Sequence, residues 1–102
     1  MNLRDIKKDI KYVIGAFVDD CSLFSVVNRA ADDEALADLL QEAVDLYNDL
    51  LDKANSKVEG AKSVYFNSIR KELLEKTNAL YEKLSEMVKA ANLPYRRALL
   101  GS

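Results

Sequence analysis

Apolar side chains recur at intervals of seven residues along most of the chain, with further apolar positions three or four residues from each of them. This spacing is typical of α-helices that pack one face against a core. The chain has only one proline and three glycines, so few positions interrupt the pattern. Three long helices are therefore predicted, over residues 3–27, 33–58 and 62–91.

The third predicted helix has an apolar stripe too wide for a two-stranded coiled coil. Three columns at intervals of seven residues cover about 100° of the helix surface, which is enough to face two neighbouring helices. Leu73, Leu80 and Met87 form one column, with Phe66 one step earlier. The second column is formed by Leu74, Tyr81 and Val88, and the third by Thr77, Leu84 and Ala91.

The second predicted helix has a still wider apolar arc, of about 160°. Such breadth indicates neighbours on both sides of this helix. We expect Leu39 and Leu46 to lie only at the margin of its core face. The expected core columns are Leu36, Ala43 and Leu50; Leu40, Tyr47 and Ala54; and Ala37, Val44, Leu51 and Val58.

The ends of the helices are marked by a few polar and special residues. Asn2 is expected to cap the first helix, with Asp5 three residues later. Gly60 stands where a helix C-terminal glycine belongs, although Ser-Lys-Val-Glu at 56–59 also matches a capping box. We expect the second helix to fray between residues 54 and 59. Pro94 ends the third helix, because the residue before a proline avoids the helical region.

The first predicted helix places Leu3, Ile10, Phe17 and Phe24 in one column. Gly15 interrupts this helix at a cost of about 1 kcal/mol relative to alanine. It marks either a close approach to another helix or a position at which the helix simply tolerates glycine. Together the three stretches predict an all-α fold, an up-down-up antiparallel three-helix bundle in a single domain over 1–102. Residues 93–102 are expected to form a tail or a short helical turn.

The composition removes several classes of catalytic and metal site. Histidine is absent, which removes the commonest general base and transition-metal ligand. The only cysteine, Cys21, lies on an apolar column and is expected to be a buried hydrophobic residue. There is no glycine-rich phosphate loop, and no pair of cysteines that would bind zinc. We therefore expect no enzyme, no cofactor, no metal and no small-molecule substrate.

Charge is distributed unevenly along the chain, whose formal net charge is -2. Residues 1–52 hold five basic and twelve acidic side chains, and residues 53–102 hold ten basic and five acidic ones. Like charges three or four residues apart destabilise a helix, so compensation is expected. The acidic ladder of the second helix consists of Asp38, Glu42, Asp45, Asp49 and Asp52, and the basic cluster of the first consists of Arg4, Lys7, Lys8 and Lys11.

The simplest interpretation pairs these two groups across an antiparallel helical hairpin. The alternative is that the acidic ladder binds a basic partner protein. The sequence therefore predicts a non-enzymatic helical module for protein–protein interaction, with self-association as one version of it. The candidate interaction surface comprises the acidic ladder, the apolar end of the first helix at Leu23, Phe24 and Val27, and the tail residues Tyr95 and Leu99.

A nucleic-acid-associated regulatory protein is the alternative function. The basic cluster would contact phosphates, with Arg96 and Arg97 of the tail. The acidic excess of the whole chain opposes this reading, because phosphate-binding proteins are usually basic.

Three segments resemble small uncharacterised helical proteins of bacteria. These segments are residues 2–10 (Asn-Leu-Arg-Asp-Ile-Lys-Lys-Asp-Ile), residues 17–21 (Phe-Val-Asp-Asp-Cys) and residues 45–50 (Asp-Leu-Tyr-Asn-Asp-Leu). The resemblance implies a bacterial helical protein and no particular chemistry. The chain has neither a signal-peptide pattern nor about twenty consecutive apolar residues, so we expect a cytoplasmic protein with no membrane partner.

Overall fold

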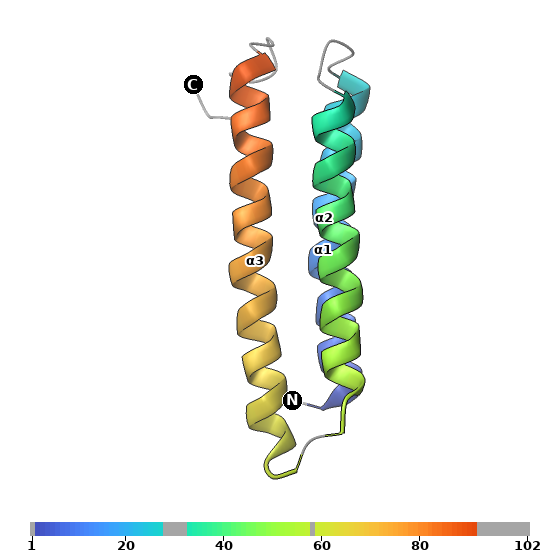
Figure 1. Ribbon diagram of the computed structural model, residues 1–102, viewed down its shortest axis with the longest axis vertical. Coiled ribbons are helices and arrows are strands. Elements are labelled where there is room, and N and C mark those ends of the chain that lie inside the picture. Colours follow the sequence, from blue (N-terminus) through green and yellow to red (C-terminus); the bar gives the residue numbers. More distant parts are fainter. Residues whose placement is uncertain (1, 28–32, 58, 92–102) are drawn as a thin grey trace.

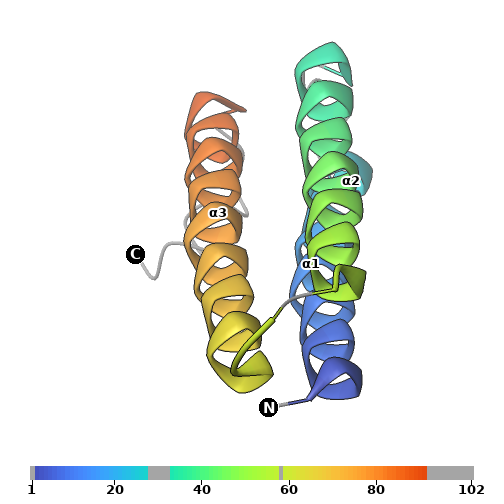
Figure 2. The ribbon, with the colours of Figure 1, turned by 60° about the horizontal axis from the view of Figure 1, so that its bottom comes forward.

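The computed structural model of the protein describes residues 2–27, 33–57 and 59–91, and it confirms the all-α three-helix bundle. Helix α1 spans Leu3–Val27, α2 spans Asp33–Asn55 and α3 spans Lys62–Ala91. Each helix packs against the other two. Figure 1 shows that α2 runs antiparallel to α1 and α3, as predicted. In the turned view of Figure 2, α1 and α2 overlap and α3 lies to their left; α1 and α2 are in contact along the bundle.

The predicted start of α1 is confirmed by its capping contact. The backbone N–H of Asp5 donates a hydrogen bond of 2.9 Å to the side-chain oxygen of Asn2. This contact satisfies one of the N–H groups that the first turn of a helix leaves unpaired.

Helix α2 ends at Asn55, three residues before the predicted boundary at 58. Ser56 closes it, because its hydroxyl donates to the Asp52 carbonyl at 2.8 Å and its N–H donates to the Lys53 carbonyl at 3.2 Å. Ser56 therefore completes α2 rather than capping α3. Gly60 follows with φ of +93°, a left-handed conformation that glycine adopts without strain.

The core lies between the three helices. Its most deeply buried large side chains come from all three: Ile6, Ile10 and Phe17 from α1, Leu50 from α2 and Leu73 from α3. Cys21 is also fully buried, as predicted. Besides these, the core contains Ile14, Phe24, Leu36, Leu39, Ala43, Leu46, Ala54, Phe66, Ile69, Leu80, Leu84 and Val88.

The core face of α2 is displaced from the predicted one, toward Leu39 and Leu46. Leu39 and Leu46, expected at the margin, are 3% and 8% exposed, whereas Val44, expected in a core column, is 46% exposed. The two neighbouring helices cover only part of the broad apolar arc. The uncovered part faces outward beside α1 and contains Leu40, Val44, Tyr47 and Leu51, of which all but Val44 are half-buried.

The structure also revises the expectation for Leu74 and decides between the two interpretations of Gly15. Leu74 of α3, expected in a flanking core column, is 49% exposed, so the stripe of α3 is narrower on that side. At Gly15 an added Cβ would meet no atom within 4 Å. This glycine therefore marks no close approach between helices within the described chain, and the helix simply tolerates it.

Candidate interaction surface

All five members of the acidic ladder are exposed, and two of them form ion pairs. Glu42 and Asp49 pair with Lys83 and Lys53, and Asp45 lines the α2–α3 surface beside them. Gln41 donates a hydrogen bond of 2.9 Å to the Asp45 carboxylate.

The ion pairs of α2 lead to α3 and not to the basic cluster of α1. Lys83 lies 2.6 Å from Glu42, and Lys53 lies 2.9 Å from Glu72 and 3.2 Å from Asp49. Among the described residues, no ion pair joins the basic cluster to the acidic ladder. The predicted pairing across the α1–α2 hairpin is therefore not formed. Glu42 is compensated by Lys83 of α3, and Asp49 by Lys53 of α2 itself.

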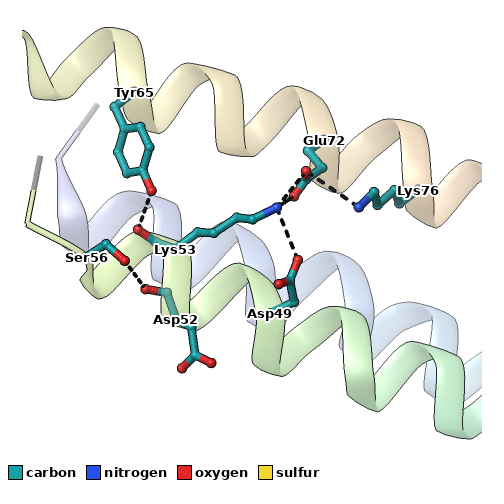
Figure 3. A network of polar contacts seen from close by, with 7 residues as sticks. All are labelled: Asp49, Asp52, Lys53, Ser56, Tyr65, Glu72 and Lys76. Atoms are coloured by element: carbon teal, nitrogen blue, oxygen red, sulfur yellow. Dashed lines mark hydrogen bonds and ion pairs between the residues drawn. The ribbon is translucent and has the colours of Figure 1, made fainter.

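Lys53, in the last turn of α2, is the centre of a polar network that links α2 to α3 (Figure 3). Its ammonium group donates to both carboxylate oxygens of Glu72 at 2.9 Å, and Lys76 adds a contact of 3.5 Å to the same carboxylate. These hydrogen bonds to Glu72 and Asp49 raise the pKa of Lys53. The Tyr65 hydroxyl donates to the Lys53 carbonyl at 2.8 Å, which ties the end of α2 to the start of α3.

The apolar end of α1 is only partly available to a partner. Leu23 is 61% exposed and its neighbour Val26, which was not among the expected surface residues, is 74% exposed. Phe24 is 3% exposed and belongs to the core, so it cannot contribute to a surface unless the bundle opens. The Val27 side chain and the tail residues Tyr95 and Leu99 lie outside the described residues.

A groove between α1 and α2 forms a surface that the sequence did not single out; we call it the α1–α2 groove. Its lower part, at the N-terminal end of α1 and toward the bottom of Figure 1, has a volume of about 410 Å³. It is lined by the whole basic cluster with Tyr47, Leu51 and Asn55. Its upper part, of about 340 Å³, shares Lys11 and Tyr47 with the lower part, which makes the groove continuous. The upper part also contains Ile14, Gly15, Val18, Asp19 and Val44.

The α1–α2 groove differs from the other two interhelical surfaces in its polar contacts. The α2–α3 surface is crossed by the Lys83–Glu42 and Lys53–Glu72 pairs. The α1–α3 surface is crossed by the Arg70–Asp9 pair at 3.4 Å and by the Tyr81–Asp20 hydrogen bond at 2.6 Å. Between residues 3–26 of α1 and 36–55 of α2, no side-chain hydrogen bond or ion pair joins the two helices. The groove is therefore open and unbridged along its length.

The electrostatics of the lower part of the groove are strongly positive. The four cations of the basic cluster lie in the first turns of α1, where the partial positive charge of the helix dipole also lies. None of the four forms an ion pair with a carboxylate of the described residues. The signal that could have located this groove is the 160° arc of α2, which is wider than two helical neighbours can cover.

Other kinds of site have little support in the described residues. In residues 2–27, 33–57 and 59–91, no three acidic or cysteine side chains converge as metal ligands would. None of the three helices is long and apolar enough to cross a membrane. Burial raises the pKa of the Cys21 thiol to about 11, with a smaller contribution from Asp20, so this thiol stays protonated and unreactive near neutral pH.

Comparison of the chain with protein families, with characterised proteins and with solved structures finds no match. The resemblance to bacterial helical proteins stays a prediction.

Proposed function

We propose that the protein is a non-enzymatic, cytoplasmic helical module that binds another protein through the α1–α2 groove. The observation that carries this proposal is the apolar strip along the groove, which no polar side-chain contact between residues 3–26 of α1 and residues 36–55 of α2 crosses. Val44 is the most exposed member of that strip, and Val18, Tyr47 and Leu51 are half-buried beside it.

The shape of the groove suits a helical partner. Two parallel ridges of side chains about 10 Å apart leave a furrow in which a third helix can lie. Amphipathic helices bind such furrows through apolar residues spaced three and four positions apart. Val26 lies on the same face of α1 as Gly15, eleven residues further along, and extends this face toward the upper end of the bundle.

The surface expected from the sequence has a smaller role in this proposal. Glu42 and Asp49 are occupied by lysines, so a basic partner would have to displace intramolecular pairs. Asp38, Asp45 and Asp52 are exposed, but none of them lines the α1–α2 groove, and Asp45 lies on the α2–α3 side of α2.

A nucleic-acid-associated regulatory protein is the second candidate function. The cations of the basic cluster favour it, because they form no ion pair in the part of the chain that the structure describes and phosphate contacts are made mainly by lysine and arginine. It predicts binding of duplex or single-stranded oligonucleotides that weakens steeply as salt rises and is lost in a Lys8→Glu variant. Absence of binding at low salt would eliminate this candidate.

Photo-crosslinking in cells of the native host tests the proposed function directly. A photoreactive amino acid replaces Val44 in the groove, and a matched control replaces Leu74 on α3, which is similarly exposed at 49%. We expect discrete protein adducts from position 44 that are absent from position 74. Folded protein that gives no adduct specific to position 44 would contradict a protein partner at this groove.

A further inference from the structure

We infer that the partner of the α1–α2 groove is an acidic amphipathic helix. This inference rests on the proposed function and specifies the chemistry of the partner. It follows from the arrangement of charge and apolar surface along the groove.

The positive charge is arranged along the groove at helical intervals. Arg4, Lys7 or Lys8, and Lys11 succeed one another every three or four residues, so they form a row parallel to the axis of α1 with a rise of about 5 Å per step. A second helix lying in the groove repeats its own side chains at the same interval. Carboxylates three, four and seven residues apart on that helix would therefore meet the row in register.

The apolar surface of the groove lies beside this row. Tyr47 and Leu51 line the same lower part of the groove as the cations, and Val44 and Val18 continue the apolar strip upward. A partner with one apolar edge and one acidic edge would cover both features together. Its apolar edge would supply most of the affinity, and its acidic edge the specificity and the rate of association.

A second copy of this chain fits the groove less well. Across a two-fold axis, the four cations of one copy would face the upper part of the groove in the other. Among the described residues that line that part, Asp19 is the only acidic side chain. One carboxylate would leave most of the four cations without a counter-charge.

Nucleic acid also fits the groove less well than an acidic helix. A phosphate backbone leaves Val18, Val44 and Leu51 without apolar partners. The formal net charge of -2 of the whole chain also opposes binding to phosphates.

Two designed peptides test the inference on the full 102-residue protein. Both are stapled helices of 21 residues with the same apolar positions, and one carries glutamates along the flanking edge where the other carries lysines. We expect the glutamate peptide to bind at least tenfold more tightly by fluorescence anisotropy, with an affinity that falls as salt rises. Lys11→Glu should weaken its binding about tenfold, whereas Lys71→Glu, the same change on the outer face of α3, should leave it unchanged.

The outcomes separate this inference from the proposed function. Equal binding of both peptides, abolished by Val44→Asp, would overturn the acidic preference while leaving a protein-binding groove. Failure of the glutamate peptide to bind at millimolar concentration would overturn the inference, and the crosslinking result at position 44 would then decide the proposed function by itself. A concentration-dependent dimer that Val44→Asp dissociates, or competition by an oligonucleotide, would also overturn it.

Discussion

The Tyr81 hydroxyl donates a hydrogen bond of 2.6 Å to the Asp20 carboxylate, and this bond joins α3 to α1 next to the core. The ring of Tyr81 meets Phe17 edge to face, with ring centroids 4.9 Å apart. One tyrosine thus combines an apolar contact in the core with a polar contact at its rim. Burial, followed by the bond to Asp20, raises the pKa of Tyr81 well above its usual value.

Removing only the hydroxyl of Tyr81 should measure how much the Tyr81–Asp20 hydrogen bond contributes to the free energy of unfolding. Tyr81→Phe keeps the aromatic contact with Phe17 and loses the hydrogen bond to a charged acceptor, so we expect a loss of about 1 kcal/mol in the free energy of unfolding. Urea denaturation measures the difference. Tyr12→Phe is the matched control, because Tyr12 is 71% exposed, and an equal loss in both variants would contradict a specific role for the Tyr81–Asp20 bond.

The buried thiol of Cys21 should make stability fall in alkaline solution. Its pKa is raised to about 11 in the folded chain from an ordinary value near 9, so the unfolded thiol ionises first as pH rises. Ionisation then favours the unfolded state, and the stabilising contribution present below pH 9 is lost between pH 9 and 11. From pH 8 to pH 10 this loss should be about 1 kcal/mol.

A variant without the thiol isolates this contribution. Cys21→Ala is less stable at every pH because it leaves a small cavity, but its free energy of unfolding should change less between pH 8 and pH 10 than that of the unmodified protein. Parallel pH profiles for the two proteins would show that Cys21 does not titrate differently in the folded and unfolded states.

The Lys53–Glu72 pair should contribute only modestly, although it is the centre of a network. The Lys53 side chain is 41% exposed, and partly exposed ion pairs are worth about 0–1 kcal/mol. A double-mutant cycle with Lys53→Met and Glu72→Gln should give a coupling energy of about 0.5 kcal/mol at low salt. The coupling should shrink in 1 M salt, and a coupling that salt leaves unchanged would contradict this electrostatic account.

The reassigned core face of α2 makes a prediction opposite to that of the heptad pattern. Leu39→Ala should cost about 3 kcal/mol, because the side chain is buried and its removal leaves a cavity, whereas Val44→Ala should cost well under 1 kcal/mol. Thermal or urea unfolding of both variants checks the contrast. A larger loss at Val44 than at Leu39 would restore the face that the sequence suggested.

Periodicity alone predicts most of this fold and little of its surface. The columns of α1 and the cap at Asn2 follow from local spacing. The structure confirms the cap and the burial of Ile10, Phe17, Cys21 and Phe24, whereas Leu3 at the start of the column is 38% exposed. On α2 the apolar arc is so wide that spacing cannot decide which part is covered. Only the positions of α1 and α3 place Leu46 inside and Val44 outside.

The predicted pairing of the basic cluster with the acidic ladder was wrong for a related physical reason. The two ion pairs that cross from α2 to α3, Lys53–Glu72 and Lys83–Glu42, depend on the packing of the two helices, which local spacing does not specify. The Lys53–Asp49 and Lys76–Glu72 pairs each join residues four positions apart in one helix and do follow from local spacing. Among the described residues the basic cluster has no acidic partner on α2, and it lines the α1–α2 groove instead.

The last prediction concerns Thr77, whose buried hydroxyl lies in the apolar stripe by which α3 faces the core. Its side chain is 3% exposed, and its hydroxyl oxygen has no hydrogen-bond partner in the described part of the chain. A buried hydroxyl without a partner costs about 1–3 kcal/mol relative to one that is satisfied. Thr77→Val keeps the shape and removes that cost, so we expect stability to rise by about 1 kcal/mol in urea denaturation. Thr77→Ala, which also removes the hydroxyl but leaves a cavity, should stabilise less or destabilise. If Thr77→Val lowered stability, the hydroxyl would have to be hydrogen-bonded in solution, and the site would need a polar residue.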